Sequence, residues 1–190
     1  AARTGSINIL DEITGNTLQT LTITQSGSTS TTTQLSSLTP TSVSQAWGTL
    51  HTNQSVEGNS LRIGGVTYYS GLGTHAYSNI KYNLGGQYAT FSGKVGLDDE
   101  VDAACEATQQ VQFIIKADGV TLWTSSVIGQ TMSAQAFTVQ VSGKNQLELL
   151  VEPLANYYCD HADWVDTQLS TTWSGCGTIP VATSVEANPG

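Results

Sequence analysis

Short runs of β-branched and aromatic residues, separated by turn signals about every ten residues, constrain this chain more than any other feature. The tightest signals are Ala117-Asp118-Gly119, Ser142-Gly143-Lys144-Asn145 and Leu84-Gly85-Gly86-Gln87. Helical periodicity is nearly absent over the 190 residues. The pattern predicts an all-β fold, a jelly-roll β-sandwich with an extra N-terminal β-hairpin.

The same pattern suggests three parts. Ser6–Leu10 and Thr17–Thr24 alternate in β fashion and predict a hairpin, and a Ser/Thr tract over Gln25–Gln34 reads as a linker or a long loop. Within the following sandwich, Ser60–Val66 is among the runs expected to form a strand. The expected parts are the hairpin with its linker (1–34), the sandwich (35–173) and an irregular tail (174–190).

The charge balance restricts the partners. Six Lys and Arg face 15 Asp and Glu, giving a net charge of −9, which argues against nucleic acid and against anionic membrane surfaces. No apolar stretch reaches the roughly 18–20 residues of a membrane span. We interpret the opening AARTGS as that of a processed or excised chain. Only 11% of the residues are charged, and the Ser/Thr-rich surface with one sequon, Asn53-Gln54-Ser55, favours secretion.

Alternating strand directions predict where the loops lie. If the three tight turns occupy one end of the sandwich, the loops between them lie together at the other end. Those loops are Thr74–Asn79, Asp98–Gln110, Ile128–Gln135 and Pro153–Asp163. They are longer and hold most of the carboxylate, imidazole and aromatic residues, so function is expected there.

Three chemistries suit such loops. Asp, Asn and carbonyl oxygens suit Ca²⁺, and His with carboxylates suits Zn²⁺, although no metal-binding motif is present. Paired carboxylates suit glycosidase-type acid/base catalysis. Planar polar side chains with an aromatic face suit the recognition of sugars.

Each candidate also has a purely structural interpretation. His75 can be a hydrogen-bonded structural histidine, and the run Asp98-Asp99-Glu100 can cap a turn. Trp164, Trp123 and Trp173 are expected to pack, whereas Trp47 lies in a Gly-flanked segment outside the expected strands and is open to a ligand-platform role.

Three cysteines leave one without a partner if a disulfide forms. Cys105 and Cys159 lie on two loops of the same predicted end, so we predict that they form a bridge. A Cys159–Cys176 bridge and three unpaired thiols are the alternatives.

Five segments in order resemble the NPCBM family of carbohydrate-binding modules, which are found attached to secreted glycoside hydrolases. They are LSSLTPTSVSQAWG (35–48), NQSVEGNSLRIGGVTYYSGLGTHAYSNIKYNLGG (53–86), FSGKVGLDDEV (91–101), VQFIIKADGVTLW (111–123) and DHADWVDTQL (160–169). The resemblance implies a galactose-binding-like jelly roll and non-catalytic binding of galactose-containing glycans. It also implies that the chain can be the C-terminal module of a larger secreted hydrolase, such as an α-galactosidase, to which it is covalently linked.

The resemblance implies which residues form the binding site. For sugar binding they are Trp47 as the platform, with His75, Asp98, Asp99, Glu100, Asp160, His161 and Asp163. A structural Ca²⁺ as in similar modules is expected away from the sugar, at the oxygen-rich loop 53–59 and near the last strand, with Asn53, Glu57 and Asp166 as ligands.

The sequence therefore predicts a secreted, non-enzymatic lectin or binding module for galactose-containing glycans. The alternatives are a small glycosidase that uses two loop carboxylates and a structural cell-wall or adhesion domain.

Overall fold

The computed structural model describes residues 3–25, 30–101, 109–154 and 158–171. The chain divides into two units, residues 1–30 with 173–190 and residues 31–172, and each is described by itself. Strands dominate the described residues, which contain one short 3₁₀ turn, η1 (Leu35–Ser37). They include no helix with the length and hydropathy that a membrane crossing needs.

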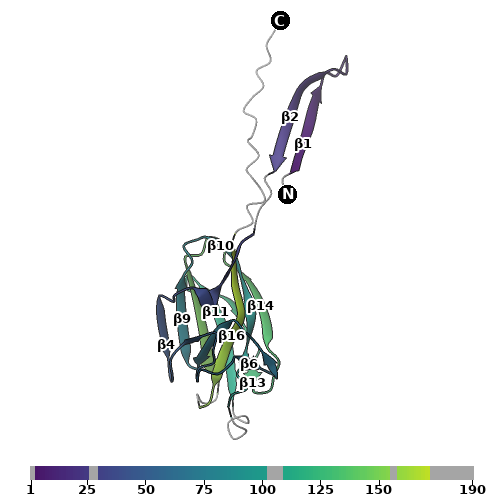
Figure 1. Ribbon diagram of the computed structural model, residues 1–190. Coiled ribbons are helices and arrows are strands. Elements are labelled where there is room, and N and C mark those ends of the chain that lie inside the picture. Colours follow the sequence, from purple (N-terminus) through teal and green to yellow (C-terminus); the bar gives the residue numbers. More distant parts are fainter. Residues whose placement is uncertain (1–2, 26–29, 102–108, 155–157, 172–190) are drawn as a thin grey trace. The chain divides into compact units, whose positions relative to one another are not determined.

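Residues 31–172 form a sandwich of two antiparallel sheets, which confirms the predicted fold class (Figure 1). The first sheet is built around β16, which pairs with β10 on one side and with β8 and β3 on the other. Its strands in spatial order are β14 (Gln135–Gln140), β10 (Tyr88–Leu97), β16 (His161–Thr171), β8 (Gly71–His75) and β5 (His51–Thr52), with β3 (Thr32–Gln34) beside the second half of β16.

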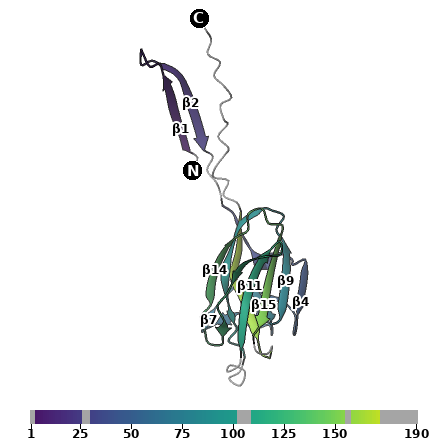
Figure 2. The ribbon, with the colours of Figure 1, turned by 180° about the vertical axis from the view of Figure 1, so that it is seen from behind.

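The second sheet faces the viewer in Figure 2. Its strands in order are β12 (Val120–Thr124), β11 (Gln110–Ala117), β15 (Gln146–Pro153), β9 (Ser78–Asn83) and β4 (Ser42–Gln45), with β13 (Ile128–Gly129) beside β11. In β11 every second residue from Val111 to Ala117 is buried, which accounts for the alternation of apolar and polar residues in this part of the sequence.

The core between the sheets contains the expected aromatic residues. Trp164 is fully buried and meets Phe113 and Phe137 edge-on, with ring centroids 5.1 and 5.9 Å apart. Trp123 is partly buried against the same core. Trp173 lies outside the described residues.

The predicted hairpin forms from β1 (Arg3–Leu10) and β2 (Thr17–Gln25). Its register places Ile7 opposite Leu21, and Asn8 opposite Thr20, whose hydroxyl donates to the Asn8 side chain at 2.9 Å. Because successive residues point to opposite faces, one face is apolar and the other polar. Asp11 closes the turn by accepting two backbone N–H groups.

The two ends of the sandwich differ as the strand directions predict. At one end the tight turns bind one another, since Asp118 accepts the Asn145 N–H at 3.0 Å and the Leu84 N–H donates to Asn145 O at 2.6 Å. At the other end the longer loops meet. Asp98 N–H donates to His161 O at 2.9 Å, and Gln130 donates to Asp98 O at 3.0 Å.

Two local expectations need correction. Ser60–Val66 does not form one strand, because Gly64 and Gly65 take positive φ and turn the chain into the short hairpin β6 (Arg62–Ile63) and β7 (Val66–Thr67). The expected linker also ends earlier than Gln34, since Thr32–Gln34 pairs with β16 as β3.

Two glycines allow the 53–59 loop and β6 to pack closely on the first sheet at the loop end of the sandwich. Gly73 in β8 and Gly96 in β10 both lie opposite Asp163 of β16. A Cβ on Gly73 would collide with the backbone of Gln54 and Ser55, and one on Gly96 would collide with Ile63. The 53–59 loop and β6 therefore lie directly on this face of the first sheet.

We predict that Gly73→Ala lowers the free energy of unfolding by about 1–3 kcal/mol, because the loop backbone must move to admit the methyl group. Denaturant unfolding measures the change. Gly129→Ala is the matched control, because its Cβ would meet only Gln109 O, at 3.5 Å. Equal stability of the two variants would contradict the close approach.

Candidate functional site

Three aromatic rings meet at the loop end of the sandwich. The ring centroids of Trp47 and His161 lie 5.5 Å apart with planes 13° from parallel, and His75 lies 5.4 Å from each. The two imidazoles are buried, whereas half of Trp47 is exposed. We call Trp47, His75 and His161 the ring cluster. It offers a flat, half-open aromatic surface beside two hydrogen-bonding rings.

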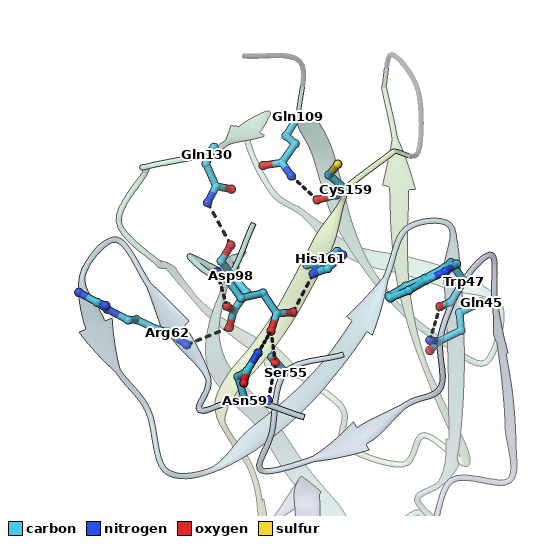
Figure 3. Close-up of polar contacts among 11 residues, drawn as sticks. Gln45, Trp47, Ser55, Asn59, Arg62, Asp98, Gln109, Gln130, Cys159 and His161 are labelled. Carbon is cyan, nitrogen blue, oxygen red and sulfur yellow. Dashed lines mark hydrogen bonds and ion pairs between the residues drawn. The ribbon is translucent and has the colours of Figure 1, made fainter. Parts of the chain in front are cut away.

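The backbone around Trp47 is held on both sides. The Gln45 side chain donates to Trp47 O at 2.7 Å (Figure 3). It also accepts the Thr74 hydroxyl at 2.9 Å. Gly48 has a φ of +69°, and a Cβ there would lie 2.8 Å from a Val56 methyl group. Trp47 therefore extends from a bend that only glycine closes without strain.

The imidazoles are placed by the strands that carry them. His75 ends β8 and pairs with His161, which begins β16. Nδ1 of His75 donates to Ala76 O at 2.5 Å. Burial lowers the pKa of His75, so the ring is neutral at pH 7 and Nε2 carries the lone pair.

Glu100 orients the second imidazole. Its Oε1 accepts Nδ1–H of His161 at 2.7 Å, and its Oε2 accepts the Asn59 amide at 3.0 Å and the Ser55 hydroxyl (Figure 3). Burial raises the pKa of Glu100, but hydrogen bonds from His161, Ser55 and Asn59 outweigh it and hold that pKa below its usual value. Glu100 is thus a fixed carboxylate under His161.

The other two acids of the LDDE run have partners in the scaffold, and their contact with sugar stays a prediction. Asp98 is 1% exposed and accepts the N–H groups of Arg62 at 2.9 Å and Glu100 at 2.8 Å. Asp99 accepts the N–H groups of the Gly64-Gly65 turn at 2.9 and 2.7 Å. Their carboxylates bind the β6–β7 hairpin to the end of β10, so they shape the site from behind.

Asp160 and Asp163 are both fully buried. Among the described residues, no hydrogen-bond donor reaches the carboxyl oxygens of either one. Burial raises the pKa of Asp160 to about 7, although the neighbouring His161 lowers it. Burial raises the pKa of Asp163 well above its usual range, and the adjacent Asp98 raises it further. Asp163 has no surface with which to contact a ligand.

Two of the three residues predicted to bind calcium have other partners in the structure. The Asn53 side-chain oxygen accepts Gly71 N–H at 3.0 Å, and the Asp166 carboxylate pairs with the Lys94 ammonium at 3.1 Å. A lysine beside a carboxylate opposes a divalent cation there. Glu57 is exposed. In the described part of the chain, no group of three or more His, Cys, Asp or Glu side chains could hold a metal.

The loop cysteines are described only in part. Cys159 takes part in a disulfide bond, and its carbonyl accepts the Gln109 amide (Figure 3). Cys105 and Cys176 lie outside the described residues, and the Cys105–Cys159 pairing stays a prediction.

Sequence reasoning missed the residues that support the ring cluster. Ser55 and Asn59 lie 45 and 41 residues from Glu100 along the chain, so no local pattern connects them. The oxygen-rich composition of the 53–59 loop is visible in the sequence, but the binding of its Ser55 and Asn59 side chains to the Glu100 carboxylate is not. Gln45 had one available signal, its place two residues before Trp47.

Comparison with known proteins assigns this architecture. The model of the NPCBM/NEW2 domain family matches residues 31–170, which is nearly the whole sandwich. The chain belongs to the NPCBM family. It is a carbohydrate-binding module, as members of this non-catalytic family are.

A curated relative is the alpha-1,3-galactosidase B of Akkermansia muciniphila, which is 34% identical over 137 residues. That match covers 70% of this chain and 17% of the relative, so the chain spans less than a fifth of that protein.

Two solved NPCBM-type structures are also similar. The CBM51 of a Clostridium perfringens GH95 protein, in complex with methyl-galactose, has a TM-score of 0.66 and 30% identity. The match covers 73% of this chain and 99% of that one. The CBM51-2 and INT domains of C. perfringens ZmpB, in complex with GlcNAc, have a TM-score of 0.69 and 28% identity, over 90% of this chain and 37% of that one.

We predict that Asp160→Asn becomes more stable relative to the wild type as the pH rises. The raised pKa of about 7 means that the stability given by the neutral acid is complete below the unfolded-state pKa and is lost as the pH rises through 7. The asparagine cannot ionise. Thermal melts at about pH 5 and about pH 8 measure the difference, and an equal difference at both would contradict a neutral, buried Asp160.

Proposed function

We propose that the ring cluster binds the terminal galactose of glycans. The observation that carries this proposal is the half-exposed Trp47 beside two buried imidazoles, one of which is fixed by Glu100. An aromatic face stacks on the apolar C–H face of a pyranose, and galactose presents such a face opposite its axial 4-hydroxyl. The relative solved with methyl-galactose supports the choice of sugar.

The imidazoles supply the polar part of recognition. Neutral His75 offers the Nε2 lone pair to a sugar hydroxyl, because its Nδ1–H is bound to Ala76 O. His161 presents its Nε2 edge, because Nδ1 is held by Glu100. Both rings keep their orientation before the ligand arrives, which reduces the entropy lost on binding. The half-open site buries little area, and we expect dissociation constants of about tens of micromolar to millimolar.

The proposed activity is binding without catalysis. A glycosidase needs one carboxyl group to protonate the leaving oxygen and a second on the other face of the sugar. In the described part of the chain, the carboxylates nearest the ring cluster have structural partners or are buried. Glu100 binds three side chains and Asp98 binds two backbone N–H groups.

The module serves a larger protein in this proposal. One of its curated relatives is a galactosidase of which the match covers 17%. We therefore infer a secreted glycoside hydrolase that acts on α-galactosides and carries this module covalently. The module then keeps the enzyme near galactose-rich glycans, and its weak affinity lets it rebind along them.

Isothermal titration calorimetry with methyl β-galactoside tests the binding site. We expect Trp47→Ala to weaken binding about tenfold or more, because it removes the stacking surface. Tyr69→Ala is the matched control, since Tyr69 is an aromatic residue that is 88% exposed and outside the ring cluster. Methyl-glucoside and GlcNAc test the choice of sugar. Unchanged affinity in Trp47→Ala would refute the site, and no binding by the wild type would refute the function.

A structural calcium ion remains a proposal from the family resemblance, with ligands other than Asp166. We expect millimolar Ca²⁺ to raise the melting temperature over that in EDTA, because an ion that binds only the folded state stabilises it. Asp166→Asn should respond as the wild type does, since its carboxylate already pairs with Lys94. Loss of the response in that variant would make Asp166 a ligand, and no response in either protein would end the calcium proposal.

A further inference from the structure

Asp163 occupies an unusual place for a carboxyl group. It lies in the middle of the first sheet, between Gly96 of β10 and Gly73 of β8. It shares the face of β16 that carries Val165, which packs with Leu61 and Ile63 in a small apolar cluster. The glycines bring the 53–59 loop and β6 down onto this face, and Asp163 is left with no exposed surface.

Asp163 and Asp98 differ in the hydrogen-bond donors that surround them. Asp98 accepts two backbone N–H groups, one at each carboxylate oxygen, from Arg62 at 2.9 Å and from Glu100 at 2.8 Å. Among the described residues, no donor reaches Asp163. Asp98 follows Gly96, the residue paired with Asp163, by two positions, so the two carboxyl groups are neighbours on one face of the sheet. Two adjacent buried carboxyl groups cannot both ionise at low cost. The N–H groups favour the charge on Asp98, so the proton belongs on Asp163.

We propose that Asp163 is a neutral carboxylic acid that donates a hydrogen bond to the Asp98 carboxylate and so positions Glu100 and His161 in the ring cluster. The chain of contacts is continuous. Asp163 satisfies Asp98, Asp98 holds the Glu100 N–H, and the Glu100 side chain holds Nδ1–H of His161. Asp163 is thus a positioning residue for sugar binding, and that part of the inference rests on the proposed function.

The charges around the pair favour the neutral acid. Asp98, Asp99 and Glu100 all raise the pKa of Asp163. The one basic side chain of the adjoining β6, Arg62, is 58% exposed and pairs with Asp99 at 3.5 Å. A group with a raised pKa gives stability that is complete below its unfolded-state pKa and is lost as the pH rises through its folded-state pKa. Raising the pH toward that folded-state pKa therefore weakens this face of the sandwich.

Carboxyl ¹³C NMR on the intact chain tests the protonation state. We expect the Asp163 signal to report a protonated acid at pH 7 and to be absent from Asp163→Asn. An ionised Asp163 at pH 7 would overturn the proposal. A shift of the Asp163 signal on adding Ca²⁺ would overturn it as well, because the pair would then be a cation site. This readout does not depend on sugar binding, so it stands even if the proposed function fails.

Two substitutions of similar size test the positioning role. Asp163→Asn keeps a donor toward Asp98, and we expect methyl β-galactoside affinity within about twofold of the wild type. Asp163→Leu removes the donor, and we expect affinity to fall more than tenfold, with loss of the His161 Nδ1–H signal in ¹H NMR. Asp166→Asn, three residues further along β16, is the control and should change neither readout, because asparagine tolerates the positive φ of that position.

The outcomes for these variants distinguish a role of Asp163 in positioning His161 from a general effect on the stability of the fold. An Asp163→Leu protein that folds and keeps the His161 signal would overturn the positioning role. If that variant does not fold, Asp163→Asn decides. Its stability relative to the wild type should increase from about pH 6 to about pH 9, and an unchanged difference would overturn the neutral acid.

Discussion

The close approach of the 53–59 loop to the first sheet is the contact on which the site depends. It requires glycine at 73, where any side chain would meet the backbone of Gln54 and Ser55. From that position Ser55 and Asn59 reach Glu100, and Glu100 in turn fixes His161. The binding geometry therefore comes from backbone packing that places four polar groups together.

Few cationic side chains are available to stabilise the acidic residues at the loop end of the sandwich. The chain has six Lys and Arg, and the buried acids are stabilised instead by backbone N–H groups, amides, hydroxyls and an imidazole. Such neutral donors have fixed directions and lose little conformational freedom when they bind a carboxylate. Where donors are missing, as at Asp160 and Asp163, burial raises the pKa of the carboxyl group and favours its neutral form.

The sequence was sufficient for the fold, and it predicts the same loop end at which we propose the site, but it does not specify the roles of the residues there. Turn signals at Asp118-Gly119 and Gly143 specify which end carries the tight turns, and alternation then places the long loops at the other. Composition alone could not separate Glu100 from its neighbour Asp99. The two differ in their hydrogen-bond donors: Ser55 and Asn59 donate to Glu100, whereas the Gly64-Gly65 turn donates to Asp99. Such partners are set by tertiary packing, which a single sequence does not display.

The length of β16 determines how far the ring cluster lies from the points where the sandwich begins and ends. The strand begins with His161 in the ring cluster and ends at Thr171, whose N–H donates to Thr31 O where the sandwich begins. Its eleven residues span about 33 Å at roughly 3.3 Å each. Thr31 and Thr171 thus lie at the end of the sandwich opposite the ring cluster. The length of β16 separates the proposed binding surface from the two points where residues 31–171 begin and end.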